Sequence, residues 1–139
     1  MQRLIAAWIV AALTFVALDA VWLTQVAPGL AAPLIGKILA PTVDLGAAIT
    51  FYLIYISGIV ALAVVPALER GGAKRAGALG AALGLTAYGS YDLTNQATLM
   101  VWDVRITLAD LAWGVFVTTC AAGAACALAS RVKLAAHSK

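Results

Sequence analysis

Three aspartates, Asp19, Asp92 and Asp110, lie inside stretches of the chain that are otherwise apolar enough to cross a lipid bilayer. A carboxylate within a membrane span costs several kcal/mol if it stays charged and unpaired. Ionisable residues in such places usually face the interior of a helix bundle or a water-filled cavity. These three residues are therefore the first candidates for a functional site.

The neighbours of the aspartates supply aromatic rings and hydrogen-bond donors. Trp22 follows Asp19 by one helical turn, and Trp113 follows Asp110 in the same way. Tyr91, Asp92 and Asn95 follow Tyr88 at spacings of three, four and seven residues, so the four side chains share one helical stripe. The candidate ligand-binding residues are Asp19, Trp22, Tyr55, Tyr88, Tyr91, Asp92, Asn95, Asp110 and Trp113.

The charges of the three carboxylates conflict if the three lie close together. Arg105 is the one basic residue near them on the same predicted side of the membrane. Like charges in a medium of low dielectric constant cannot all stay ionised. The protein must therefore protonate at least one aspartate, pair one with Arg105, bind a cation, or hold the three apart.

Each aspartate also has a plainer interpretation. Thr107-x-x-Asp110 has the spacing of a capping box at a helix start. Asp19 could reach solvent at the membrane interface, with Trp22 as a residue of the aromatic belt. Asp92 could belong to a purely structural hydrogen-bond network.

The composition is that of an integral membrane protein. The chain has 139 residues, of which 64% are hydrophobic and 11% charged, and its mean hydropathy is +1.00. A soluble domain has about one quarter charged residues. The net charge of +3 does not indicate nucleic acid, because the basic residues lie at the ends of apolar runs, where they signal topology.

Four apolar runs of about twenty residues predict membrane-spanning helices. We expect an all-α, four-transmembrane-helix bundle that forms a single integral membrane domain over residues 1–139. The helices are predicted at residues 4–26, 45–68, 76–99 and 107–130. The first run is too long for the apolar part of a signal peptide.

The basic residues predict the orientation of the bundle. Lys37 and Arg105 fall on one side, and the other side has Arg3, Arg70, Lys74, Arg75, Arg131, Lys133 and Lys139. Both termini are therefore expected in the cytoplasm of a bacterium, in a multi-pass protein of the inner membrane. A rise of about 1.5 Å per residue then puts all three aspartates in the outer leaflet.

Small residues predict close helix packing. Gly80-x-x-x-Gly84 allows two helix backbones to approach, either within the chain or in a homo-oligomer. The one histidine, His137, lies in the polar tail, which argues against histidine-ligated zinc or haem in the membrane. We expect no metal and no cofactor.

Several motifs together resemble a known family. They are Leu18-Asp19-x-x-Trp22-Leu23, Phe51-Tyr52-x-x-Tyr55-x-x-Gly58, Pro66-Ala67-Leu68, Tyr91-Asp92-Leu93-Thr94-Asn95-x-Ala97-Thr98-Leu99 and Asp110-x-x-Trp113-Gly114. The chain resembles the domain-of-unknown-function family 2177, which consists of small bacterial proteins predicted to have four membrane helices. Members often have proline after the tryptophan equivalent to Trp102, where this chain has Asp103. The resemblance implies membership and topology and assigns no catalytic residue.

Three functions fit these observations. The first is a module that binds or translocates a small polar, cationic or lipid-headgroup ligand among the aspartates and aromatic rings. The second is a membrane enzyme that modifies a lipid with paired carboxylates as acid and base, although no serine–histidine pair, nucleotide loop or metal-ligand cluster is found. The third is an accessory subunit whose polar cluster only fixes helix packing. We favour the first, with membrane lipid as the surrounding partner.

Overall fold

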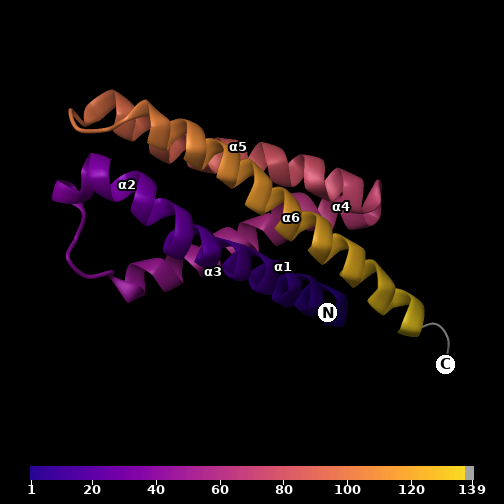
Figure 1. Ribbon diagram of the computed structural model, residues 1–139. Coiled ribbons are helices and arrows are strands. Elements are labelled where there is room, and N and C mark those ends of the chain that lie inside the picture. Colours follow the sequence, from indigo (N-terminus) through magenta and orange to yellow (C-terminus); the bar gives the residue numbers. More distant parts are fainter. Residues whose placement is uncertain (137–139) are drawn as a thin grey trace.

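The computed structural model describes residues 1–136, and helices joined by short connections make up this part of the chain (Figure 1). In chain order the elements are α1 Gln2–Val21, η1 Trp22–Val26, α2 Ala27–Ile35, η2 Gly36–Ile38, α3 Leu45–Ile59, η3 Val60–Val64, α4 Val65–Glu69, α5 Gly72–Thr98 and α6 Val104–Ala136. No strand occurs among these residues, which confirms the expected all-α fold.

Three helical stretches are long and apolar enough to cross a membrane, by length and composition. They are Gln2–Ile38, Leu45–Glu69 and Val104–Val132. The remaining long helix, α5, has 27 residues but is more polar. Its predicted span therefore rests on its length and on its packing within the bundle.

The polarity of α5 is partly hidden by its own backbone. Each of four hydroxyl side chains donates a hydrogen bond to the carbonyl oxygen four residues earlier: Thr86, Ser90, Thr94 and Thr98. Hydroxyls that are satisfied in this way need no water. The cost of placing α5 in lipid is therefore lower than its composition indicates.

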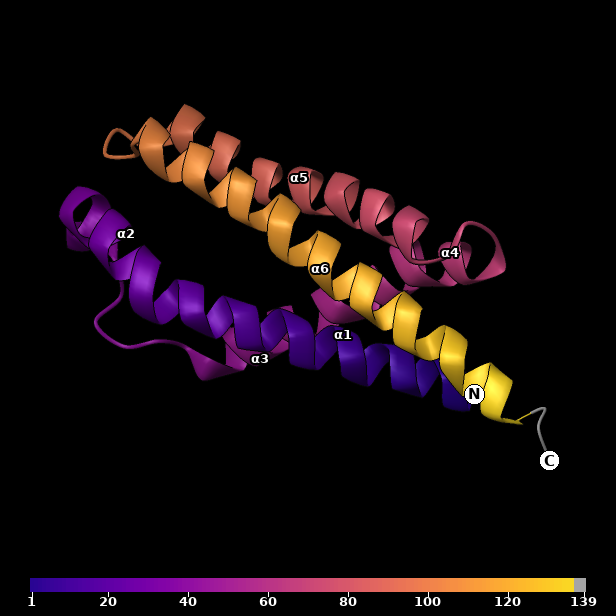
Figure 2. The same ribbon diagram turned by 45° about the vertical axis from the view of Figure 1, so that its right-hand side comes forward.

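The segments that carry most of the basic residues gather at one end of the molecule. Figures 1 and 2 both show the N-terminus, the turn between α4 and α5, and the C-terminal end of α6 at this end. The α2–α3 connection and the α5–α6 loop lie at the opposite end. Helices of this up-and-down arrangement bring the three aspartate-bearing segments to comparable heights.

The first helix is longer than the predicted range 4–26, because α1 continues through η1 and α2 to Ile35. Within η1 the chain forms a π-helical turn, in which the N–H of Ala27 donates to the carbonyl oxygen of Trp22, five residues earlier. Pro28 follows directly. A proline ring clashes with the carbonyl four residues back in a regular helix, and the wider π turn relieves the clash without ending the helix.

The second helix repeats this device. In η3 the N–H of Val65 donates to the carbonyl oxygen of Val60, and Pro66 follows. The second helix, predicted at residues 45–68, widens before Pro66 and continues to Glu69.

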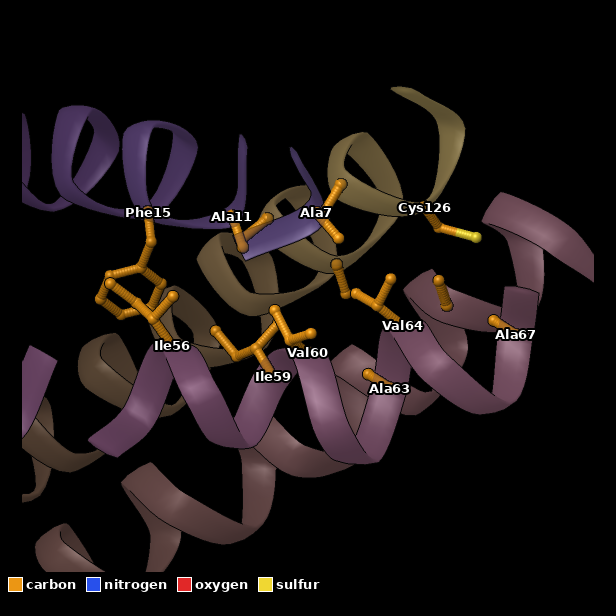
Figure 3. Packing of buried hydrophobic residues seen from close by; sticks show 14 of the residues in the cluster. Ala7, Ala11, Phe15, Ile56, Ile59, Val60, Ala63, Val64, Ala67 and Cys126 are labelled. Atoms are coloured by element: carbon orange, nitrogen blue, oxygen red, sulfur yellow. The ribbon is translucent and has the colours of Figure 1, made fainter. Parts of the chain in front are cut away.

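The apolar core lies between α1, the α3–η3 segment and α6 (Figure 3). Ala7, Ala11 and Phe15 are fully buried and follow each other at intervals of four residues on α1. Asp19 occupies the next place in this stripe and is only 7% exposed. The helical period therefore turns Asp19 toward the interior of the bundle and not toward lipid.

Helices α5 and α6 pack more closely than ordinary side chains allow. A Cβ atom added to Gly80 would lie 2.8 Å from the carbonyl oxygen of Thr118, and one added to Gly84 would overlap the carbonyl oxygen of Gly114. The predicted Gly80-x-x-x-Gly84 face is thus used within the chain, where it brings the two backbones together.

Candidate functional site

Asp19 connects three helices by hydrogen bonds. The Tyr52 hydroxyl on α3 donates to Oδ2 of Asp19 over 2.6 Å. The Trp113 indole on α6 donates to Oδ1 over 3.2 Å. Both oxygens of this buried carboxylate are therefore satisfied by neutral donors. The interpretation of Asp19 as a solvated interfacial residue is wrong.

Aromatic rings surround this carboxylate on several sides. Trp22 stacks on Trp113 with ring centroids 4.8 Å apart and planes 10° apart. Phe51 stacks on Tyr55 at 5.4 Å, and Tyr55 meets Tyr88 edge to face at 6.4 Å. Such geometries are favourable for aromatic pairs and hold the rings in defined orientations.

The Tyr55 ring is further held by a hydrogen bond to the helix behind it. Its hydroxyl and that of Thr118 on α6 lie 2.9 Å apart. The Tyr88 ring occupies the space where a side chain at position 114 would begin, so Gly114 is what lets this ring lie against α6. Tyr55 of α3 and Tyr88 of α5 are thus both held against α6.

These side chains line a partly open cavity of about 420 Å³. Pockets for small molecules have volumes of about 300 to 1,000 Å³. The residues that line it are Asp19, Trp22, Leu23, Ala48, Phe51, Tyr52, Tyr55, Ala87, Tyr88, Tyr91 and Asp110. Two carboxylates and six aromatic side chains therefore face the cavity, and none of the described residues that line it is lysine or arginine.

Arg105 does not join the aspartates, because it pairs with Asp103. Its Nη2 lies 2.9 Å from Oδ2 of Asp103, and its Nε donates to Oδ1 over 2.9 Å. The hydrogen bonds from Arg105 lower the pKa of the exposed Asp103 carboxyl to about 2. Arg105 therefore does not neutralise the aspartates that line the cavity.

Asp103 also caps helix α6. Its Oδ1 accepts a hydrogen bond from the backbone N–H of Arg105 over 2.8 Å, which is the function of an N-cap residue. Because α6 begins at Val104, Asp110 lies in its second turn. The interpretation of Asp110 as a capping residue is therefore wrong, and the residue lines the cavity instead.

Asp92 takes a different position. Its side chain is 0% exposed, it does not line the cavity, and neither of its oxygens has a hydrogen-bond partner among the described residues. Asn95 does not line the cavity either. Of the nine predicted residues, the structure brings six to the cavity wall: Asp19, Trp22, Tyr55, Tyr88, Tyr91 and Asp110. Trp113 lies directly behind them, on Trp22 and Asp19.

Five lining residues were not predicted: Leu23, Ala48, Phe51, Tyr52 and Ala87. The most important is Tyr52, because it donates the shorter hydrogen bond to Asp19. The aromatic run Phe51-Tyr52-x-x-Tyr55 was visible in the sequence. Adjacent residues point in different directions on a helix, so the run alone did not show that both tyrosines face the same cavity.

Replacing Tyr52 by phenylalanine is expected to lower the free energy of unfolding by about 1 to 2 kcal/mol, because a hydrogen bond to a buried carboxylate is lost. Reversible unfolding in mixed detergent measures the change. Tyr91→Phe serves as the control, since this ring also lines the cavity but is 59% exposed. Equal effects of the two substitutions would contradict a specific role for Tyr52.

Comparison with known proteins places the chain by family. No curated protein and no solved structure matches it. The model of one family, described as predicted membrane protein (DUF2177), matches residues 4–127, which contain all the cavity residues. This match confirms the resemblance seen in the sequence motifs. The chain is a membrane-embedded helical protein and belongs to the DUF2177 family of predicted membrane proteins.

Proposed function

We propose that this protein binds a small organic cation in the cavity between α1, α3, α5 and α6. The observation that carries the proposal is the combination of two carboxylates and six aromatic rings around a space of about 420 Å³. Aromatic faces attract cations through their quadrupole, and this attraction grows when water is excluded. The carboxylates supply the compensating charge.

The walls suit an ammonium group better than a metal ion. Calcium and magnesium require about six or more oxygen ligands at close distance. Here the carboxylates lie among rings and apolar side chains such as Leu23 and Ala48. An alkylated ammonium group has a diffuse charge and an apolar surface, and both match such walls.

The location proposed for this activity is the inner membrane of a bacterium, with both termini in the cytoplasm and the cavity in the outer leaflet. The asymmetry of basic residues supports this orientation. An ammonium ligand could be free in solution or form part of a lipid headgroup. The same site would serve a protein that only binds the cation and a protein that binds it as one step of translocation.

Isothermal titration of the purified protein tests the proposal. We expect saturable binding of tetraethylammonium chloride in detergent, and no such binding of sodium chloride at matched ionic strength. In a second arm, added ethanolamine lipid should compete with tetraethylammonium if the ligand is a headgroup, and should have no effect if the ligand is a free cation. Absence of saturable heat with tetraethylammonium would overturn the proposal.

A further inference from the structure

The fully buried carboxyl of Asp92 has no role in the cavity wall. Gly84 of α5 lies against Gly114 of α6, and the two helices run antiparallel (Figure 2). Two turns further along α5 therefore correspond to two turns back along α6. This register places Asp92 opposite residues 106–110 of α6, the segment that carries the cavity residue Asp110.

The surroundings of Asp92 differ from those of Asp19. Asp19 receives hydrogen bonds from Tyr52 and Trp113, whereas both oxygens of Asp92 lack partners among the described residues. An unpaired carboxylate in such a place is costly, and the usual response is to bind a proton. A buried polar group without a partner requires an explanation.

Charged and titratable groups around Asp92 leave Asp110 as its partner. Asp110 on α6 is close enough for their charges to interact. Tyr88 and Tyr91 lie on α5 itself. Asp19 is close enough to Asp110 for their charges to interact, and its own oxygens accept hydrogen bonds from Tyr52 and Trp113. Arg105, near the start of α6, is paired with Asp103. Two neighbouring carboxyls without a cation between them share a proton as a coupled pair.

We propose that Asp92 is a proton-binding site linked to the cation in the cavity, an inference that rests on the proposed function. In the empty protein the pair holds one proton, on Asp92, and Asp110 is ionised. When a monovalent cation occupies the cavity, its charge favours ionisation of Asp92. The O–H bond of Asp92 then breaks and the proton leaves to bulk solvent. One positive charge enters and one leaves, so the net charge of the site is unchanged.

This linkage gives cation binding a defined pH dependence. Because binding releases a proton, the affinity for tetraethylammonium rises with pH, by up to about tenfold per pH unit for one proton. Asp103 does not contribute, since its pKa is held at about 2 by Arg105. His137 lies outside the described residues, and replacing it with glutamine in all variants removes its titration from the measurement.

The test compares Asp92→Asn with the parent protein between about pH 5 and 8, where an ordinary aspartate is ionised. Titrations in two buffers of different ionisation enthalpy give the number of protons released per cation. We expect release of up to one proton by the parent, and binding without release or pH dependence by Asp92→Asn. Asp44→Asn, at the exposed start of α3 and outside the cavity, is the control and should behave like the parent. Equal proton release by the parent and Asp92→Asn would overturn the proposal.

A second measurement separates this inference from the proposed function. Infrared spectra of the ligand-free protein should show the carbonyl stretch of one protonated carboxyl, and Asp92→Asn should lack it. If this band is absent from the parent, the inference fails even though cations bind. If the band is present and tetraethylammonium does not bind, the proposed function and the linkage fail together, and only the protonation of Asp92 is supported.

Discussion

Replacing Gly84 by alanine is expected to lower the free energy of unfolding by about 3 kcal/mol, the upper part of the range for overpacked interiors. The added Cβ would overlap the carbonyl oxygen of Gly114 and lie 2.9 Å from Oγ1 of Thr118. A carbonyl oxygen belongs to the backbone and cannot rotate away. Helices α5 and α6 must therefore separate, and Tyr88, which lies against Gly114, shifts with them.

Gly89→Ala is the matched control on the same helix. A Cβ at this position would meet only the Cδ1 atom of Leu93, at an ordinary distance of 3.9 Å. Alanine favours a helix over glycine by up to about 1 kcal/mol, so this variant should equal or exceed the parent in stability. Unfolding in mixed detergent compares the three proteins. A stability of Gly84→Ala equal to that of Gly89→Ala would show that the close contact between α5 and α6 is not required.

The helices were predictable because their signal is a property of the local sequence. Long apolar runs and small-residue spacing gave the all-α bundle and the packing face at Gly80 and Gly84. The end of the first helix was not predictable in the same way. Pro28 is ordinarily a sign that a helix stops, and here a π turn accommodates it. Whether a helix ends or widens before a proline depends on neighbouring contacts that the sequence does not display.

The sequence showed which residue types the candidate site would contain, but not which of them would face the same cavity. Helical periodicity placed Tyr88, Tyr91 and Asp92 on a common stripe, yet a stripe on a helix of this length faces more than one neighbour. The tyrosines line the cavity, whereas Asp92 does not and is fully buried. The hydrogen bond between Asp19 and Trp113 forms only because α1 packs against α6, and the sequence does not show which helices pack together. That relation links residues 94 positions apart in the chain.

The two cavity carboxylates then have different tasks. Both oxygens of Asp19 accept hydrogen bonds from protein donors, so this residue holds Tyr52 and Trp113 in place as well as contributing charge. Asp110 is half-buried, lines the cavity and is not neutralised by Arg105, which pairs with Asp103. If the protein binds a cation as proposed, we expect the contact to fall chiefly on Asp110.

Asp110→Asn is accordingly expected to weaken tetraethylammonium binding at least about 30-fold, which corresponds to about 2 kcal/mol, the lower end of the cost of removing one partner of a desolvated charge pair. The amide preserves the size of the side chain, so the cavity and the aromatic wall remain. Isothermal titration at a pH where the parent binds most tightly measures the effect.

Asp44→Asn controls for the loss of a negative charge near the same end of the bundle, and asparagine can still cap helix α3. Asp44 lies outside the cavity and is exposed at the start of α3, so solvent screens its charge from the cavity. Its replacement should change tetraethylammonium affinity by less than about twofold. Because net charge changes equally in both variants, a general electrostatic attraction would weaken them alike. Only direct contact with the cation makes Asp110→Asn the weaker binder by an order of magnitude, and equal affinities would mean that the cation lies elsewhere.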